Sequence, residues 1–126
     1  MTCKRRTAAR AALSTLAILQ TVMLAALYAG VPPHPPSATP LFAMAPFLAM
    51  SLSTAAAGLA YSASANLGGR IFGALAALLA LVSFGPQKYF DAQLPEIWPA
   101  VVTGQFAAGV LLVLALHPAR TPRQAK

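Results

Sequence analysis

The side chains that most often carry out catalysis are few in this chain and far apart. Its only histidines are His34 and His117, and its only cysteine is Cys3. Hydrolytic and transfer centres need a nucleophile beside a base, or a ring of metal ligands. A single cysteine excludes an internal disulfide and an all-cysteine metal site. No CxxC, HExxH or glycine-rich phosphate motif is present. We therefore expect no enzymatic activity, no cofactor and no bound metal.

Two amides lie inside long apolar stretches. Gln20 is halfway along the first stretch, and Gln105 is near the middle of the last. An unpaired amide in hydrocarbon costs several kcal/mol, so each amide is expected to have a partner. If the two stretches are antiparallel neighbours, both amides lie at a similar depth, and we predict a hydrogen bond between them. The alternative is that one of them binds a ligand or a partner subunit.

The composition places these stretches in a membrane. Hydrophobic residues make up 58% of the chain and charged residues only 9%, whereas soluble domains use charged residues at about a quarter of their positions. So few charges cannot cover a water-soluble globule of this size, but a lipid environment removes that requirement. The sequence therefore predicts an all-α integral membrane protein whose first partner is the lipid bilayer.

Four apolar runs are long enough to consider as membrane helices, since about 20 helical residues cross a bilayer. They predict a single transmembrane domain, residues 1–126, with helices at about 11–31, 41–65, 69–86 and 97–116. The third is the weakest, because its strictly apolar part, 71–84, is only ~21 Å long as a helix. It fits either a spanning or a re-entrant helix. A proline-rich loop, 32–40, separates the first two runs, and a turn at Asn66, Gly68 and Gly69 precedes the third.

The basic residues favour four crossings. With four crossings, eight of the nine basic residues lie on one side: Lys4, Arg5, Arg6, Arg10, Arg70, Arg120, Arg123 and Lys126. Only Lys88 lies on the other side, as expected from the positive-inside rule. A re-entrant third helix would put the basic tail on the side opposite Arg5. We therefore predict a four-helix bundle with both termini in the cytoplasm. Alanine- and arginine-rich usage suggests the cytoplasmic (inner) membrane of a bacterium.

The basic N-terminal region and the positive net charge also fit two other interpretations. Residues 1–30 resemble a secretory signal, although the apolar run is long and Leu27 before Ala29 is a poor cleavage site. The net charge of +7 also fits nucleic-acid binding, but the basic residues flank apolar runs, as membrane orientation requires. We expect no nucleic-acid partner, and some affinity for anionic lipid head groups.

The segment 85–99 is the only stretch that combines aromatic residues with both signs of charge. Its aromatic rings are of the kind that anchor helices at the head-group level, and Pro95 and Glu96 suit a helix start. The alternative is an external docking loop for a partner. The residues expected to form that loop are Lys88, Tyr89, Asp91, Glu96 and Trp98.

None of the four runs, taken as 11–31, 41–65, 71–84 and 97–116, contains a charged residue, whereas ion-coupled transport normally needs one in the membrane. In length and helix number the chain is similar to the small multidrug-resistance transporters. That family requires a glutamate in its first helix, which this chain lacks, so its function is not transferred.

Small residues at helical spacing favour close helix packing. The leading hypothesis is thus an accessory or structural subunit that packs with other membrane proteins or with itself. One alternative is a small oligomeric transporter or channel, with Gln20, Gln105 and hydroxyls such as Ser83 and Thr103 lining its path. The other is a holin-like membrane-perturbing protein.

Overall fold

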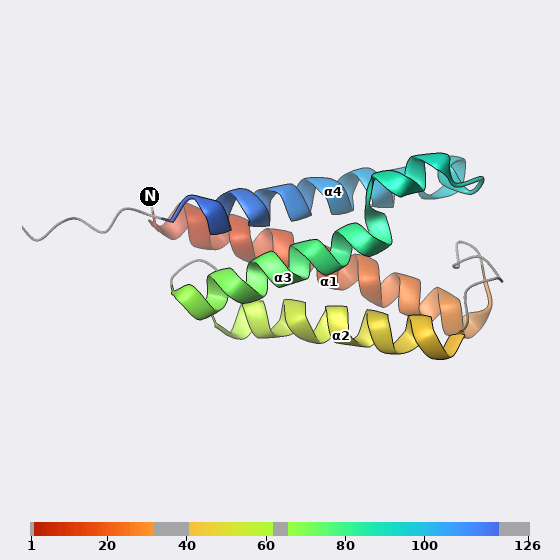
Figure 1. The fold of residues 1–126 in the computed structure, drawn as a ribbon, viewed down its shortest axis with the longest axis horizontal. Coiled ribbons are helices and arrows are strands. Elements are labelled where there is room, and N and C mark those ends of the chain that lie inside the picture. The colour runs from red at the N-terminus through yellow and green to blue at the C-terminus, as the bar shows by residue number, and fades with distance from the viewer. Residues whose placement is uncertain (1, 32–40, 62–65, 119–126) are drawn as a thin grey trace, which may run out of the picture.

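The computed structural model describes residues 2–31, 41–61 and 66–118. It contains four α-helices and one short 3-10 helix: α1 Thr2–Ala29, α2 Leu41–Ala60, α3 Leu67–Phe84, η1 Pro86–Phe90 and α4 Leu94–Leu116 (Figure 1). The expected proline loop, the end of the second helix at 62–65 and the basic residues Arg120, Arg123 and Lys126 lie outside the described residues. The predicted all-α fold is confirmed.

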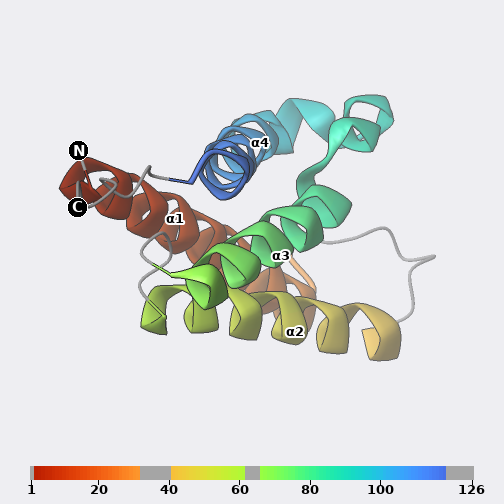
Figure 2. The ribbon, with the colours of Figure 1, turned by 60° about the vertical axis from the view of Figure 1, so that its left-hand side comes forward.

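The four helices run up and down in sequence order (Figures 1 and 2). Each helix packs against the next along the chain, and α4 packs back against α1. The helix α1 also contacts α3 across the bundle, whereas α2 and α4 occupy opposite corners. The starts of α1 and α3 and the end of α4 therefore meet at one end of the bundle, here called the arginine end after Arg5 and Arg70. The opposite end, with η1, is called the η1 end.

The third helix is long enough to cross a bilayer. It begins at Leu67, and its 18 residues are about 27 Å long at 1.5 Å per residue. The side chain of Asn66 caps it by accepting a hydrogen bond from the Gly69 backbone N–H at 2.7 Å. Gly68 therefore belongs to the first turn of α3, and its expected place in a turn before the helix is wrong. All four α-helices are long and apolar enough to span a membrane.

The first helix begins nine residues earlier than the apolar run predicts, at Thr2 rather than residue 11. Basic residues are good helix formers, so the helix extends beyond its apolar part. Its other end closes at Gly30, whose φ of 65° is the left-handed conformation that glycine favours. The Val31 N–H then bonds to the Ala26 carbonyl at 3.2 Å, which completes a Schellman motif. The end of α1 is therefore a local property of its sequence.

The core of the bundle is built mainly from alanine. Its buried residues are Ala9, Ala12, Leu13, Leu16, Ala55, Ala76, Ala77, Ala80, Ala107, Ala108 and Leu111. Small side chains let helix backbones approach closely. A Cβ placed on Gly58 of α2, for example, would lie 3.0 Å from Cδ1 of Leu13. These small residues therefore pack helix against helix within one chain.

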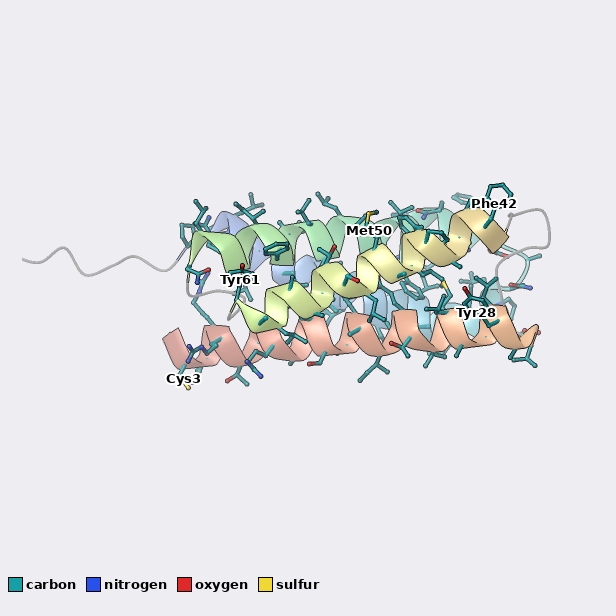
Figure 3. All side chains as sticks on the ribbon, turned by 90° about the horizontal axis from the view of Figure 1, so that it is seen from below. Cys3, Tyr28, Phe42, Met50 and Tyr61 are labelled. Carbon is teal, nitrogen blue, oxygen red and sulfur yellow. The ribbon has the colours of Figure 1, made fainter. Side chains whose placement is uncertain are left out.

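The outer surface of the helices is suited to lipid. In each candidate membrane span only 28% to 39% of the residues are buried inside the bundle. Large apolar side chains, such as Phe42 and Phe106, project outward. Hydroxyls on this surface bond within their own helix, as Thr21 does to the Ala17 carbonyl at 2.7 Å, so they need no water. Tyr61 lies at the arginine end, and Tyr28 and Phe42 lie at the other (Figure 3). Aromatic residues at both ends are characteristic of membrane interfaces.

Candidate functional site: polar contacts in the interior and at the helix ends

The amide of Gln20 is buried, with 1% of the residue exposed, and it bonds to α2. Its Nε2 donates a hydrogen bond to Oγ of Ser51, which is fully buried. Within the described part of the chain, Oε1 of Gln20 has no hydrogen-bond partner. The expected bond between Gln20 and Gln105 is therefore wrong. Although α1 and α4 are neighbours, equal depth does not decide which way an amide points around its helix.

The amide of Gln105 instead joins α4 to the end of α3. Its Nε2 donates to the backbone carbonyl of Phe84 at 3.0 Å, and its Oε1 accepts from the Tyr89 hydroxyl at 3.0 Å. The ring of Phe84 packs against the neighbouring residue, Gly104, where an added Cβ would lie 3.0 Å from Cβ of Phe84. Two consecutive residues of α4 thus bind both the backbone and the side chain of the last residue of α3.

We expect a double-mutant cycle to show coupling between Gln20 and Ser51. Ser51→Ala leaves the Gln20 N–H groups without their acceptor, so the coupling free energy should be ~0.6 to 2 kcal/mol. Unfolding of the purified protein in mixed micelles measures it. The control is Ser53→Ala, because the exposed Ser53 hydroxyl donates to the Ala49 carbonyl of its own helix and should not couple to Gln20. Coupling between Gln20 and Gln105 larger than that between Gln20 and Ser51 would contradict these assigned partners.

Side-chain amides also satisfy the last carbonyls of α3. These groups have no partner inside a helix, and in an apolar medium each unpaired one is costly. Nε2 of Gln87 donates to the carbonyls of Leu81 at 3.1 Å and Val82 at 2.7 Å, and Gln105 takes that of Phe84. An added Cβ on Gly85 would overlap the Leu81 carbonyl oxygen. Glycine at this position therefore lets the chain turn close to the helix end.

Several side chains of the expected docking loop bond to other residues of the same chain. Nζ of Lys88 and Oδ2 of Asp91 form an ion pair at 3.3 Å, and Oδ1 of Asp91 accepts from the Gln93 backbone N–H at 3.0 Å. Glu96 lies in the first turn of α4 as expected, beside Pro95. Glu96 and Trp98 are exposed. Two of the five predicted docking residues, Lys88 and Asp91, thus pair with each other, and Tyr89 is bonded to Gln105.

The carboxyl of Asp91 should make this corner sensitive to acid. The hydrogen bond from Gln93 and the ion pair with Lys88 lower the pKa of Asp91 below its ordinary value. A lowered pKa stabilises the fold above the ordinary value, and that contribution is lost as the pH falls through the folded-state pKa. We expect faster hydrogen exchange at the Gln93 amide, relative to its intrinsic rate, below about pH 4. Asp91→Asn should remove this pH dependence, and an unchanged profile in that variant would contradict the assignment.

Two arginines hold the end of α4. Arg5 of α1 donates to the backbone carbonyls of Leu114, at 3.1 Å, and His117. Arg70 of α3 donates through Nε to the Ala115 carbonyl at 3.1 Å, and also through Nη2. The last turn of α4 has no basic residue of its own. Cations favour the negative end of a helix dipole, so residues far away in the sequence provide the charge. The sequence positions of the two arginines predict only a role in membrane orientation.

The remaining candidate residues do not come together. His117 caps α4 at the arginine end, with its backbone N–H on the Val113 carbonyl, and the free Cys3 is exposed. In residues 2–31, 41–61 and 66–118 no group of three His, Cys, Asp or Glu could hold a metal. Ser83 is buried whereas Thr103 is exposed. These two hydroxyls therefore do not line one path through a single bundle.

The fold has the architecture of a small multi-pass membrane protein: four packed helices, each able to span a bilayer, with an apolar outer surface. No protein-family model matches the chain, and neither does any curated protein or solved structure. The functional proposals below therefore rest on the chain's own residues.

Proposed function

We propose that the chain is a structural, accessory subunit that packs with other proteins in a bacterial cytoplasmic membrane. Both of its termini lie in the cytoplasm, and it has no enzymatic activity. One observation carries the proposal: polar side chains in the interior and at the arginine end hold the helices together. Gln20, Gln105 and the two arginines all bind residues of another helix. In this proposal the interior gives rigidity, and the outer surface meets lipid and other membrane proteins.

The charge distribution supports the orientation. Five of the six described basic residues belong to the starts of α1 and α3, and only Lys88 belongs to the η1 end. The five are Lys4, Arg5, Arg6, Arg10 and Arg70. Both acidic side chains, Asp91 and Glu96, belong to the η1 end. The positive-inside rule therefore favours a bundle whose arginine end faces the cytoplasm. Reporter fusions after residue 126 and within 32–40 test this topology, and an external C-terminus would overturn it.

The outer surface of α4 offers a direct test of the accessory role. A photo-crosslinking amino acid at Phe106, which is 75% exposed, should capture another membrane protein reproducibly in cells. The same amino acid at Leu111, which is 2% exposed, is the matched control and should capture none. Adducts to a second copy of the chain would identify a homo-oligomer. Lipid adducts alone at every exposed position would contradict the accessory role.

A small oligomeric transporter or channel is the second candidate, because two buried side-chain oxygens have no partner within the described residues. These are Oε1 of Gln20 and Oγ of Ser83. Groups of this kind solvate a polar solute in channels. Flux through liposomes that contain the purified protein, lost in Gln20→Leu, would favour this candidate over the accessory role. Leakage of large solutes on mild expression would instead favour the holin-like alternative.

A further inference from the structure

The arginine end carries cationic side chains that no acidic side chain neutralises. They are Lys4, Arg5, Arg6, Arg10 and Arg70. The only two acidic side chains of the chain, Asp91 and Glu96, are at the η1 end. Three of the cations lie at the start of α1 and Arg70 lies at the start of α3, where the positive end of a helix dipole disfavours cations. An anionic partner at this end would offset the mutual repulsion of these cations and their unfavourable interaction with the helix dipoles.

The two arginines retain unused hydrogen-bond donors. A guanidinium has five N–H donors. Within the described residues, Arg70 donates through Nε and Nη2 and Arg5 donates through Nη2 alone. Nε of Arg5 is shielded from solvent and has no acceptor among the described residues. A shielded, unpaired N–H of a charged group costs free energy. Nη1 of both arginines has no hydrogen bond to the described residues, and a phosphate oxygen is a suitable charged acceptor for it.

The surroundings of the arginines suit a phospholipid. Leu67, one turn before Arg70, is 67% exposed, and Leu116, beside the carbonyl that Arg70 binds, is 75% exposed. Tyr61 stacks on Phe72 with 5.4 Å between ring centroids, and it marks the interface at this end (Figure 3). Acyl chains would contact the exposed leucines while the head group meets the guanidinium groups.

We propose that the arginine end binds the phosphate head group of an anionic phospholipid through Arg5 and Arg70, with Lys4, Arg6 and Arg10 adding to the attraction. The bound lipid joins the N-terminal turns of α1 and α3 to the end of α4. This inference rests on the proposed insertion of the bundle in a bilayer. It goes beyond it by assigning a specific lipid class to a defined site.

Native mass spectrometry of the full chain in a neutral detergent tests the site. With phosphatidylglycerol and phosphatidylcholine at equal concentration, we expect the anionic lipid to bind at least tenfold more tightly. Arg70→Gln should weaken its binding roughly fivefold, since each basic residue near anionic lipid contributes about that factor. Lys88→Gln, at the η1 end, is the matched control and should leave it unchanged. Equal binding of the two lipids, or an equal loss in Lys88→Gln, would overturn the proposal.

Arg70→Lys separates lipid binding from capping of α4. Lysine keeps the charge but not the planar fork that binds one carbonyl through two nitrogens. Lipid affinity should therefore stay within about threefold of the parent, and a loss as large as that of Arg70→Gln would show a capping role only. If Arg70→Gln does not fold, the combined variant Lys4→Gln, Arg6→Gln, Arg10→Gln keeps the capping bonds and should still lose anionic lipid.

Two further experiments are needed. One distinguishes a lipid head group from free phosphate as the bound anion, and the other distinguishes failure of the lipid site from failure of the proposed membrane topology. Inorganic phosphate that displaces the lipid at micromolar concentration would show a site for free phosphate and would overturn the lipid assignment. Reporter fusions test topology without reference to lipid preference. A chain with the expected topology but no lipid preference thus loses only the lipid site. A chain found outside the membrane fraction loses both proposals.

Discussion

Gly104→Leu is expected to separate α3 from α4 and to lower the free energy of unfolding by about 3 kcal/mol, within the range of overpacked cores. An added Cβ at Gly104 would lie 3.0 Å from Cβ and 3.2 Å from Cγ of Phe84. Phe84 is only 5% exposed and is the last residue of α3, so its ring has little room to move. Unfolding in mixed micelles measures the loss, and faster hydrogen exchange in α4 should accompany it.

Gly109→Leu is the matched control on the same helix. An added Cβ at Gly109 meets nothing within 4 Å, and the residue is exposed. Both variants replace a helical glycine with the same residue, so they share the gain in helix propensity. Gly109→Leu should therefore leave stability unchanged or raise it by up to about 1 kcal/mol. An equal loss in both variants would contradict a specific contact between Gly104 and Phe84.

The second large effect is expected from removing both arginines at the end of α4. The combined variant Arg5→Gln, Arg70→Gln deprives the carbonyls of Leu114 and Ala115 of charged donors. Hydrogen bonds to charged groups contribute about 1.5 to 3 kcal/mol each. Both arginines are half-buried, so solvent weakens their hydrogen bonds to the carbonyls. We therefore expect the free energy of unfolding to fall by about 2 kcal/mol in total. Unfolding in mixed micelles of a neutral detergent, without added lipid, measures it.

The control for this variant is Arg6→Gln. Arg6 is exposed, and the described residues give its side chain no hydrogen bond or ion pair, so its loss should have little effect on stability. Fraying should also be local: amide exchange should rise in the last turns of α4 and not in α2, which occupies the opposite corner of the bundle. Uniformly faster exchange in all four helices would contradict a cap that acts on α4.

The number, approximate places and apolar character of the helices could be predicted from the sequence. Long apolar runs and a scarcity of charge impose helices near the bilayer-spanning length of about 20 residues, because a lipid-exposed backbone must bond to itself. Local signals were sufficient for the start of α4 near Pro95 and Glu96, and the predicted end of the first helix at residue 31 is two residues past its observed end at Ala29. The ion pair between Lys88 and Asp91 was predictable, since they are three residues apart.

The partners of the interior polar groups were decided only by the tertiary structure. Depth along a helix can be counted from the sequence, and it placed Gln20 and Gln105 at similar levels. The direction in which each amide points depends on how each helix is rotated against its neighbours, and side-chain packing from all of them sets that rotation. Gln20 thus meets Ser51 on α2, and Gln105 meets the end of α3.

The same distinction applies to the arginines. Their sequence positions were enough to predict an orientation in the membrane, because the positive-inside rule depends on charge near helix ends and not on contacts. That Arg5 and Arg70 also cap α4 could not be predicted, because it requires the starts of two helices and the end of a third to meet. The sequence by itself therefore determined four apolar helices and the asymmetry of their charge. Only the packed bundle decided which carbonyls the arginines bind, since that depends on distances between residues far apart in the chain.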